Sequence, residues 1–137
     1  MYASRADIEA RYGADVLVAA VDESGRVDDA RVEAAISAAS AEIDSYVAVR
    51  HALPLSSVPA VLVQHCIDMA VFKMSAGSDV LTDEVKERYK SSVAWLKDLS
   101  RGHATLGLKA RPGQTSARPV ISTGPARRFT RAKLQDL

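Results

Sequence analysis

The sequence predicts an all-α fold, a small bundle of about four to five helices followed by a long extended C-terminal arm. Three observations lead to this prediction. Apolar residues recur at spacings of three and four along several segments, which is the pattern of amphipathic helices. Alanine, the strongest helix former, is abundant, and aromatic residues make up only 5% of the chain. From Gly102 onward the periodicity stops, and this stretch holds three of the five prolines.

A short helix is predicted to begin after Ser4 and to end at Gly13. Ser4 is a suitable N-cap residue, and Asp7 places its charge near the positive end of the helix dipole. Glycine is the residue that most often ends a helix. A second short helix is expected over residues 14–21, before the polar turn at 22–25.

The next predicted helix is longer and covers residues 29–51. Asp28 or Asp29 can cap its first turn. Its apolar residues follow the spacing that gives a helix one buried face. We assign Ile43 and Tyr46 to the structural core of the bundle.

A central helix is predicted over residues 59–75. Pro54 and Pro59 push the residues before them toward extended conformations, and Pro59 fits the first turn of the helix that follows. This helix is apolar almost all round, which is typical of an element covered on several sides. It is too short and too often interrupted by polar residues for a membrane span. Its predicted core residues are Leu62, Ile67, Asp68 and Phe72.

The last predicted helix begins after Thr82, which can cap it, and ends at Gly102. Asp83 and Glu84 in its first turn suit the helix dipole. We assign Tyr89 and Leu96 on its apolar stripe to the core.

Charge divides the chain into two parts, a helical body at 1–102 and an extended basic arm at 103–137. Residues 1–100 contain 10 Lys/Arg and 16 Asp/Glu, a net charge of −6. Residues 101–137 contain 8 Lys/Arg and one Asp, a net charge of +7. Such an asymmetry indicates an interaction segment.

Motifs for catalysis, metal binding and nucleotide binding are not found in the sequence. His65 and Cys66 are adjacent, so on a helix their side chains diverge by roughly 100°. We interpret them as a half-exposed histidine beside a core cysteine. The segment 22–29 resembles a calcium loop only faintly, because Arg26 and Val27 occupy its fifth and sixth positions. We therefore expect no enzyme, no metal and no cofactor.

Asp68 is unusual because it lies in the most apolar helix. A buried carboxylate normally requires a partner. We expect an ion pair with a nearby arginine or lysine, such as Arg50 or Arg88, in preference to a functional acid.

The end of the arm interleaves basic residues with apolar ones, and two interpretations remain open. Lys/Arg clusters can bind the phosphates of nucleic acid. They can also dock onto acidic protein surfaces, and spaced apolar side chains favour this interpretation. The alternative function is thus a small nucleic-acid-binding protein with a basic arm. The predicted partner-binding residues are Arg127, Arg128, Phe129, Arg131, Leu134 and Leu137.

Several segments, in order, resemble one family. They are the opening Tyr2-Ala-Ser-Arg-Ala-Asp-Ile-Glu-Ala-Arg-Tyr-Gly13, then Ala41-Glu-Ile-Asp-Ser-Tyr46, Leu53-Pro-Leu55, Cys66-Ile-Asp-Met-Ala70 and the closing Pro125-x-Arg-x-Phe-x-Arg131. The chain resembles the head–tail adaptor proteins, also called head completion or connector proteins, of Mu-like phages and prophages.

This resemblance implies a structural virion protein at the head–tail interface, made in the host cytoplasm. It implies a homo-oligomeric ring, usually twelvefold, that binds the portal protein on one side. A tail-side stopper or tail terminator protein would bind on the other side, and DNA would pass through the lumen without sequence specificity. No membrane is implied. The closing motif implicates Arg127, Phe129 and Arg131 in docking.

Overall fold

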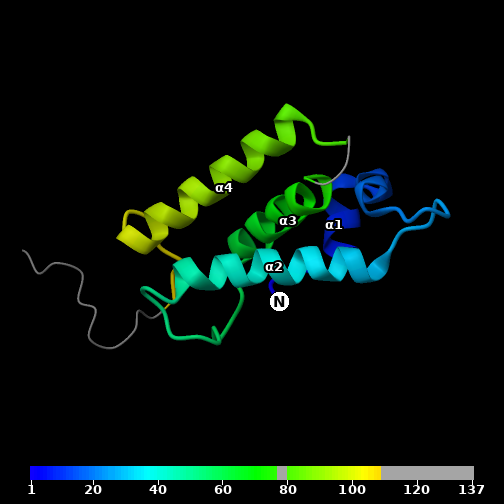
Figure 1. Cartoon of the computed structure of the whole chain (residues 1–137). Coiled ribbons are helices and arrows are strands. Elements are labelled where there is room, and N and C mark those ends of the chain that lie inside the picture. The colour runs from blue at the N-terminus through cyan, green and yellow to red at the C-terminus, as the bar shows by residue number, and fades with distance from the viewer. Residues whose placement is uncertain (77–79, 109–137) are drawn as a thin grey trace, which may run out of the picture.

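The computed structural model describes residues 1–76 and 80–108. Its elements are α1 (Arg5–Tyr12), the 3₁₀ helix η1 (Ala14–Ala20), α2 (Asp29–Val47), α3 (Ala60–Ser75) and α4 (Asp83–Arg101). Helices α2, α3 and α4 form a bundle, and α1 with η1 covers one end of it (Figure 1). The all-α prediction is confirmed. Within these two ranges the only β pairing is a single bridge between Val21 and Val27.

Local capping positions the first two elements. The Ser4 side chain accepts a hydrogen bond from the Asp7 N–H, and the Asp7 carboxylate accepts one from the Ser4 N–H at 2.8 Å. This reciprocal pair satisfies two backbone donors that α1 would otherwise leave unpaired. Gly13 then adopts φ +80°, and its N–H donates to the Glu9 carbonyl at 2.8 Å, which ends α1.

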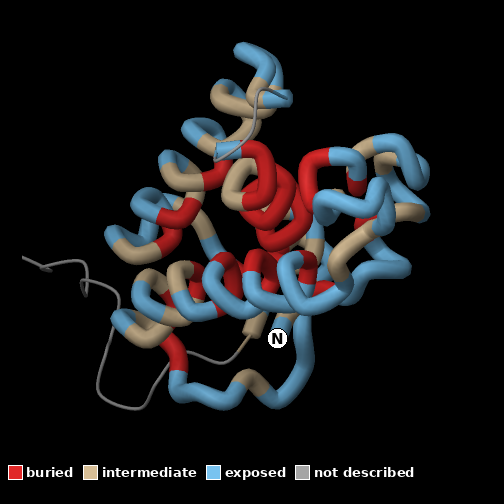
Figure 2. Tube along the Cα trace, turned by 45° about the vertical axis from the view of Figure 1, so that its right-hand side comes forward, coloured by how far each residue is buried: buried red, intermediate tan, exposed pale blue. Residues whose placement is uncertain are grey.

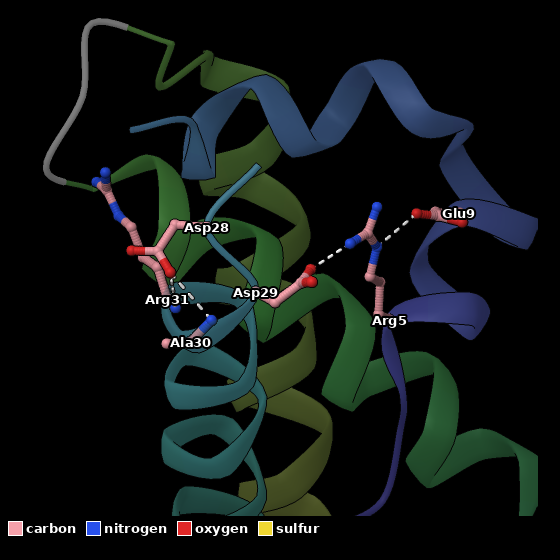
Figure 3. Close-up of polar contacts among 6 residues, drawn as sticks. All are labelled: Arg5, Glu9, Asp28, Asp29, Ala30 and Arg31. Atoms are coloured by element: carbon pink, nitrogen blue, oxygen red, sulfur yellow. Dashed lines mark hydrogen bonds and ion pairs between the residues drawn. The ribbon is translucent and has the colours of Figure 1, made fainter. Parts of the chain in front are cut away.

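Helix α2 begins as predicted but ends earlier. The Asp28 carboxylate accepts from the N–H groups of Ala30 and Arg31 at 3.0 and 3.3 Å (Figure 3). The predicted end at residue 51 was wrong, because α2 ends at Val47. Val47 is its last buried apolar residue, so another turn of helix would bury no further apolar side chain.

Helix α3 is the centre of the bundle, as its composition predicted. It packs against α2, α4 and η1. Figure 2 shows α3 buried along most of its length, whereas α2 buries mainly the side that faces α3. Pro59 caps α3 with φ −65° and is not its first residue. No helix among residues 1–76 and 80–108 is both long and apolar enough to cross a membrane.

The eight residues assigned to the core divide into two groups. Five side chains are buried: Ile43, Leu62, Ile67, Asp68 and Leu96. Three aromatic side chains are half-buried against the rim of the core: Tyr46, Phe72 and Tyr89. The rings of Phe72 and Tyr89 stack with centroids 4.1 Å apart, so they cover the core between α3 and α4.

Helix α4 ends at Gly102, which adopts the left-handed conformation with φ +85°. Its N–H donates to the Leu99 carbonyl at 3.0 Å. The Arg50 guanidinium lies directly over Gly102, so even a Cβ at this position would overlap it. The chain then stays on the body, because Leu106 is buried in the same core. The first residues of the predicted arm therefore still pack against the helices.

Candidate functional site

The residues predicted to bind partners are Arg127, Arg128, Phe129, Arg131, Leu134 and Leu137, and all of them lie outside the described residues. The structure therefore describes the surfaces of the helical body that a partner segment could contact. Three regions stand out: an acidic end, a polar cluster around Asp68 and a groove beside the N-terminus.

The acidic end is formed by α1, η1, the turn that follows and the start of α2. Residues 5–33 contain eight Asp/Glu and four Lys/Arg, a net charge of −4. The Arg5 guanidinium lies between the carboxylates of Glu9 and Asp29 and so joins α1 to the start of α2 (Figure 3). Arg5 and Asp29 are well exposed, so their ion pair contributes little to the stability of the fold.

In the turn at residues 22–26 of the acidic end, the Asp22 carboxylate accepts hydrogen bonds from the turn itself. It accepts from the Ser24 hydroxyl at 2.6 Å and from the N–H groups of Arg26 and Ser24 at 3.0 and 2.8 Å. These bonds, the one from the Ser24 hydroxyl above all, lower the pKa of Asp22. This is the geometry of a side-chain-stabilised turn. Within residues 1–76 and 80–108 no group of three or more His, Cys, Asp or Glu side chains is arranged to hold a metal ion.

The polar cluster surrounds the buried carboxylate of Asp68. The Tyr12 hydroxyl donates to this carboxylate, and the Arg11 Nε lies 3.7 Å from it. Burial raises the pKa of Tyr12, so the hydroxyl keeps its proton for this bond. The Arg88 guanidinium lies over the Tyr12 ring, 4.7 Å from its centroid. The cluster thereby joins α1, α3 and α4.

The partners predicted for Asp68 were wrong, although an arginine is present. Arg88 pairs with Glu84 on its own helix, and Arg50 lies over Gly102. The arginine is Arg11, because α1 folds across α3 and brings Arg11 and Tyr12 to the carboxylate. The inward position of Tyr12, four residues after the buried Ile8, was the available signal.

His65 and Cys66 point to different neighbours. His65 Nδ1 lies 3.0 Å from the Ser92 hydroxyl, and its ring stacks on Trp95 with centroids 4.6 Å apart. Burial lowers the pKa of His65 and raises the pKa of the Cys66 thiol. Cys66 is fully buried beside Ser40. A low-pKa thiolate next to a base, which a cysteine nucleophile requires, is not formed here.

Another polar contact, at Glu42 of α2, joins all three helices of the bundle. Its carboxylate accepts from the Tyr89 hydroxyl of α4 at 2.9 Å and from the Lys73 ammonium of α3 at 2.8 Å. Burial and the Glu42 carboxylate together raise the pKa of Tyr89 to about 12.

We therefore predict a loss of stability at alkaline pH. Between pH 10 and pH 12 the folded state holds the Tyr89 proton more tightly than the unfolded state, so the free energy of unfolding falls as pH rises. The Tyr89→Phe variant keeps the ring stack on Phe72 but has no hydroxyl to titrate, so this pH-dependent part of the stability disappears. Urea unfolding at pH 8 and pH 11 measures the difference. The variant should be about 1 kcal/mol less stable at pH 8. Its stability should fall less than that of the wild type at pH 11, and an equal fall would contradict the assignment.

The groove lies between the N-terminal residues, α2 and the loop that precedes α3. It has a volume of about 420 Å³ and is lined by Met1, Tyr2, Asp44, Leu53, Pro54, Leu55 and Val58. Tyr2 is fixed by two bonds to α2, one from its N–H to the Ser40 hydroxyl at 3.1 Å and one from its own hydroxyl to Asp44. This groove could not be predicted from the sequence, because nothing in residues 1–2 or 53–58 indicates that they lie side by side.

Fold and site together define a small helical protein with an acidic end, a buried polar cluster and a partly apolar groove beside the N-terminus. Over residues 2–122 the chain matches the family described as Bacteriophage Mu, Gp36. The chain belongs to this family of Mu-like phage proteins, as its segments indicated.

Two relatives agree with this assignment. The chain is 36% identical over 110 residues to the Mu-like prophage FluMu protein gp36 of Haemophilus influenzae, covering 79% of this chain and 77% of that protein. It is 35% identical over 121 residues to Gene product J of Escherichia phage Mu, covering 86% of this chain and 82% of that protein. The family match ends at residue 122, before the closing segment at 125–131.

Proposed function

We propose that this protein is a structural virion subunit, a head–tail connector adaptor of a Mu-like phage. Copies form a twelvefold ring under the portal protein, and the ring lumen passes DNA. A tail-side stopper or tail terminator protein binds the opposite face. The protein acts by binding, without catalysis and without a cofactor. It is made in the host cytoplasm and is then incorporated at the head–tail interface of the virion.

Membership of the Mu Gp36 family carries this proposal, because it sets the phage context. The charge distribution supports the assembly role. A body with a net charge of −6 and a C-terminal segment with a net charge of +7 attract each other across copies. An arm that only bound DNA would need the charge but not Phe129, Leu134 and Leu137.

The proposal is tested by co-expressing the portal protein with the full chain or with a chain that ends at residue 108. The core described above lies within residues 1–108, so the shortened chain should keep its helical circular dichroism and its cooperative unfolding. It should no longer co-purify with portal rings. Normal attachment of the shortened chain to the portal would contradict the docking role of the arm.

The full chain and its portal complex can also be used to test the alternative function, nucleic-acid binding. A DNA-binding protein would retain duplex DNA with an affinity that falls steeply as salt rises. We expect the full chain to elute from immobilised DNA at low salt while the portal complex persists. DNA binding by the full chain that outlasts its portal binding in rising salt would favour the nucleic-acid interpretation.

A further inference from the structure

The groove beside the N-terminus carries apolar side chains that the fold itself does not bury. Met1 is 72% exposed, Leu53 39% and Val58 46%. These three line the groove together, although they come from opposite parts of the chain. The other strongly exposed apolar residues of the described ranges are scattered over other segments: Val18, Val49 and Val80. Clustering of exposed apolar side chains around one hollow is typical of a docking site.

The groove also contains a carboxylate. Asp44 of α2 lines it and accepts the Tyr2 hydroxyl. A carboxylate has two oxygens and about four lone-pair positions, so it can accept an arginine as well. A short peptide with one large apolar side chain between arginines therefore matches the groove in both character and charge.

The chain itself contains such a peptide at 127–131, Arg-Arg-Phe-Thr-Arg. Its route begins close to the groove. The end of α4 meets the turn after α2, where Arg50 lies over Gly102, and Leu106 is buried in the body. In Figure 1 the last described residues lie beside the C-terminal end of α2 and the loop after it. From Leu108 to Phe129 the chain can span up to about 70 Å, at ~3.3 Å per residue. This is more than twice the ~28 Å length of the 19-residue helix α2, so the peptide can extend beyond its own body.

We propose that the groove of Met1, Tyr2, Asp44 and the 53–58 loop binds residues 127–131 of a neighbouring copy. Phe129 enters between the exposed apolar side chains, and its flanking arginines face Asp44. Each copy then gives one arm and receives one, which is a head-to-tail contact of the kind that closes rings. This inference rests on the proposed ring and names the surface that holds its subunits together.

Disulfide trapping in the full-length chain tests the contact. One copy carries Leu53→Cys and a differently tagged copy carries Phe129→Cys, and the two are co-expressed with the portal protein and oxidised. A disulfide forms only when the two Cβ atoms approach to about 4 Å. The native Cys66 is fully buried and stays out of the reaction. Val18→Cys is the matched control, because Val18 is exposed but lies on η1, away from the groove.

The inference predicts that the Leu53→Cys copy forms at least five times more mixed disulfide with Phe129→Cys than the Val18→Cys copy does. Val58→Cys repeats the test at a second groove position, and circular dichroism confirms that each variant folds. Equal trapping at Val18 would overturn the inference. A disulfide found only within one chain, when both cysteines are placed in the same copy, would also overturn it.

Portal binding in the same samples separates this inference from the proposed function. Portal-bound rings without trapping at either groove position would refute the groove contact and leave the connector role intact. Trapping between copies that never bind the portal would support the groove contact and refute the connector role.

Discussion

Asp68→Leu is expected to lower the free energy of unfolding by about 2 kcal/mol, because the half-buried Tyr12 hydroxyl loses its acceptor. The Arg11 guanidinium loses its partner as well, but it is partly exposed and adds less. In a body of this size such a loss lowers the melting temperature by roughly 10 °C. Thermal unfolding followed by circular dichroism measures the change.

A double-mutant cycle isolates the contact. Tyr12→Phe should be destabilising by itself, because it removes the hydroxyl and leaves the carboxylate buried. Combining it with Asp68→Leu should cost clearly less than the sum of the two single changes, since both partners are then gone. Additive effects would show that the two side chains do not depend on each other.

The same variant distinguishes a structural acid from a functional one. Below its melting temperature, Asp68→Leu should join portal rings as the wild type does. Unchanged thermal unfolding together with lost assembly would contradict the structural role of Asp68.

Phe129→Ala is expected to weaken the association of the chain with assembled rings by at least tenfold. Truncating a central aromatic anchor typically costs about 2 kcal/mol or more, and tenfold corresponds to about 1.4 kcal/mol. The stability of the body should not change, because the buried residues of the described ranges already pack against one another in a single core. Titration of labelled chain into purified ring–portal complexes measures the affinity.

Thr130→Ala is the matched control for this prediction. It lies next to Phe129 but removes neither an apolar anchor nor a charge, so its affinity should stay within about twofold of the wild type. Equal losses for the two variants would contradict the assignment of Phe129 as the anchor. Wild-type affinity that fell steeply as salt rose, together with no loss in Phe129→Ala, would indicate that charge, and not the aromatic side chain, holds the arm.

Local features of the fold could be predicted from the sequence, because each depends on residues within one turn of each other. Ser4 and Thr82 accept the N–H bonds expected of N-caps, and Gly102 adopts the conformation that ends a helix. The central position of α3 followed from its composition. The end of α2 could not be predicted, because Ala48, Val49 and Arg50, which follow Val47, are all compatible with a continuing helix.

Features that depend on distant segments could not be predicted. The contact of Tyr12 with Asp68 joins residues 56 positions apart, and that of Tyr2 with Asp44 joins residues 42 apart. To predict either contact, one would have to know in which direction the N-terminal residues cross the bundle. The groove has the same origin, because Met1 and Tyr2 on one side and residues 53–58 on the other are distant in the sequence.

Imaging of the chain assembled with its portal protein would show whether the helical body folds by itself and whether residues 127–131 bind another copy. We expect a ring in which Phe129 of each copy lies in the groove of its neighbour, between Met1, Leu53 and Val58. An assembled ring in which that segment lies on the helices of its own chain, without touching any other, would contradict this expectation.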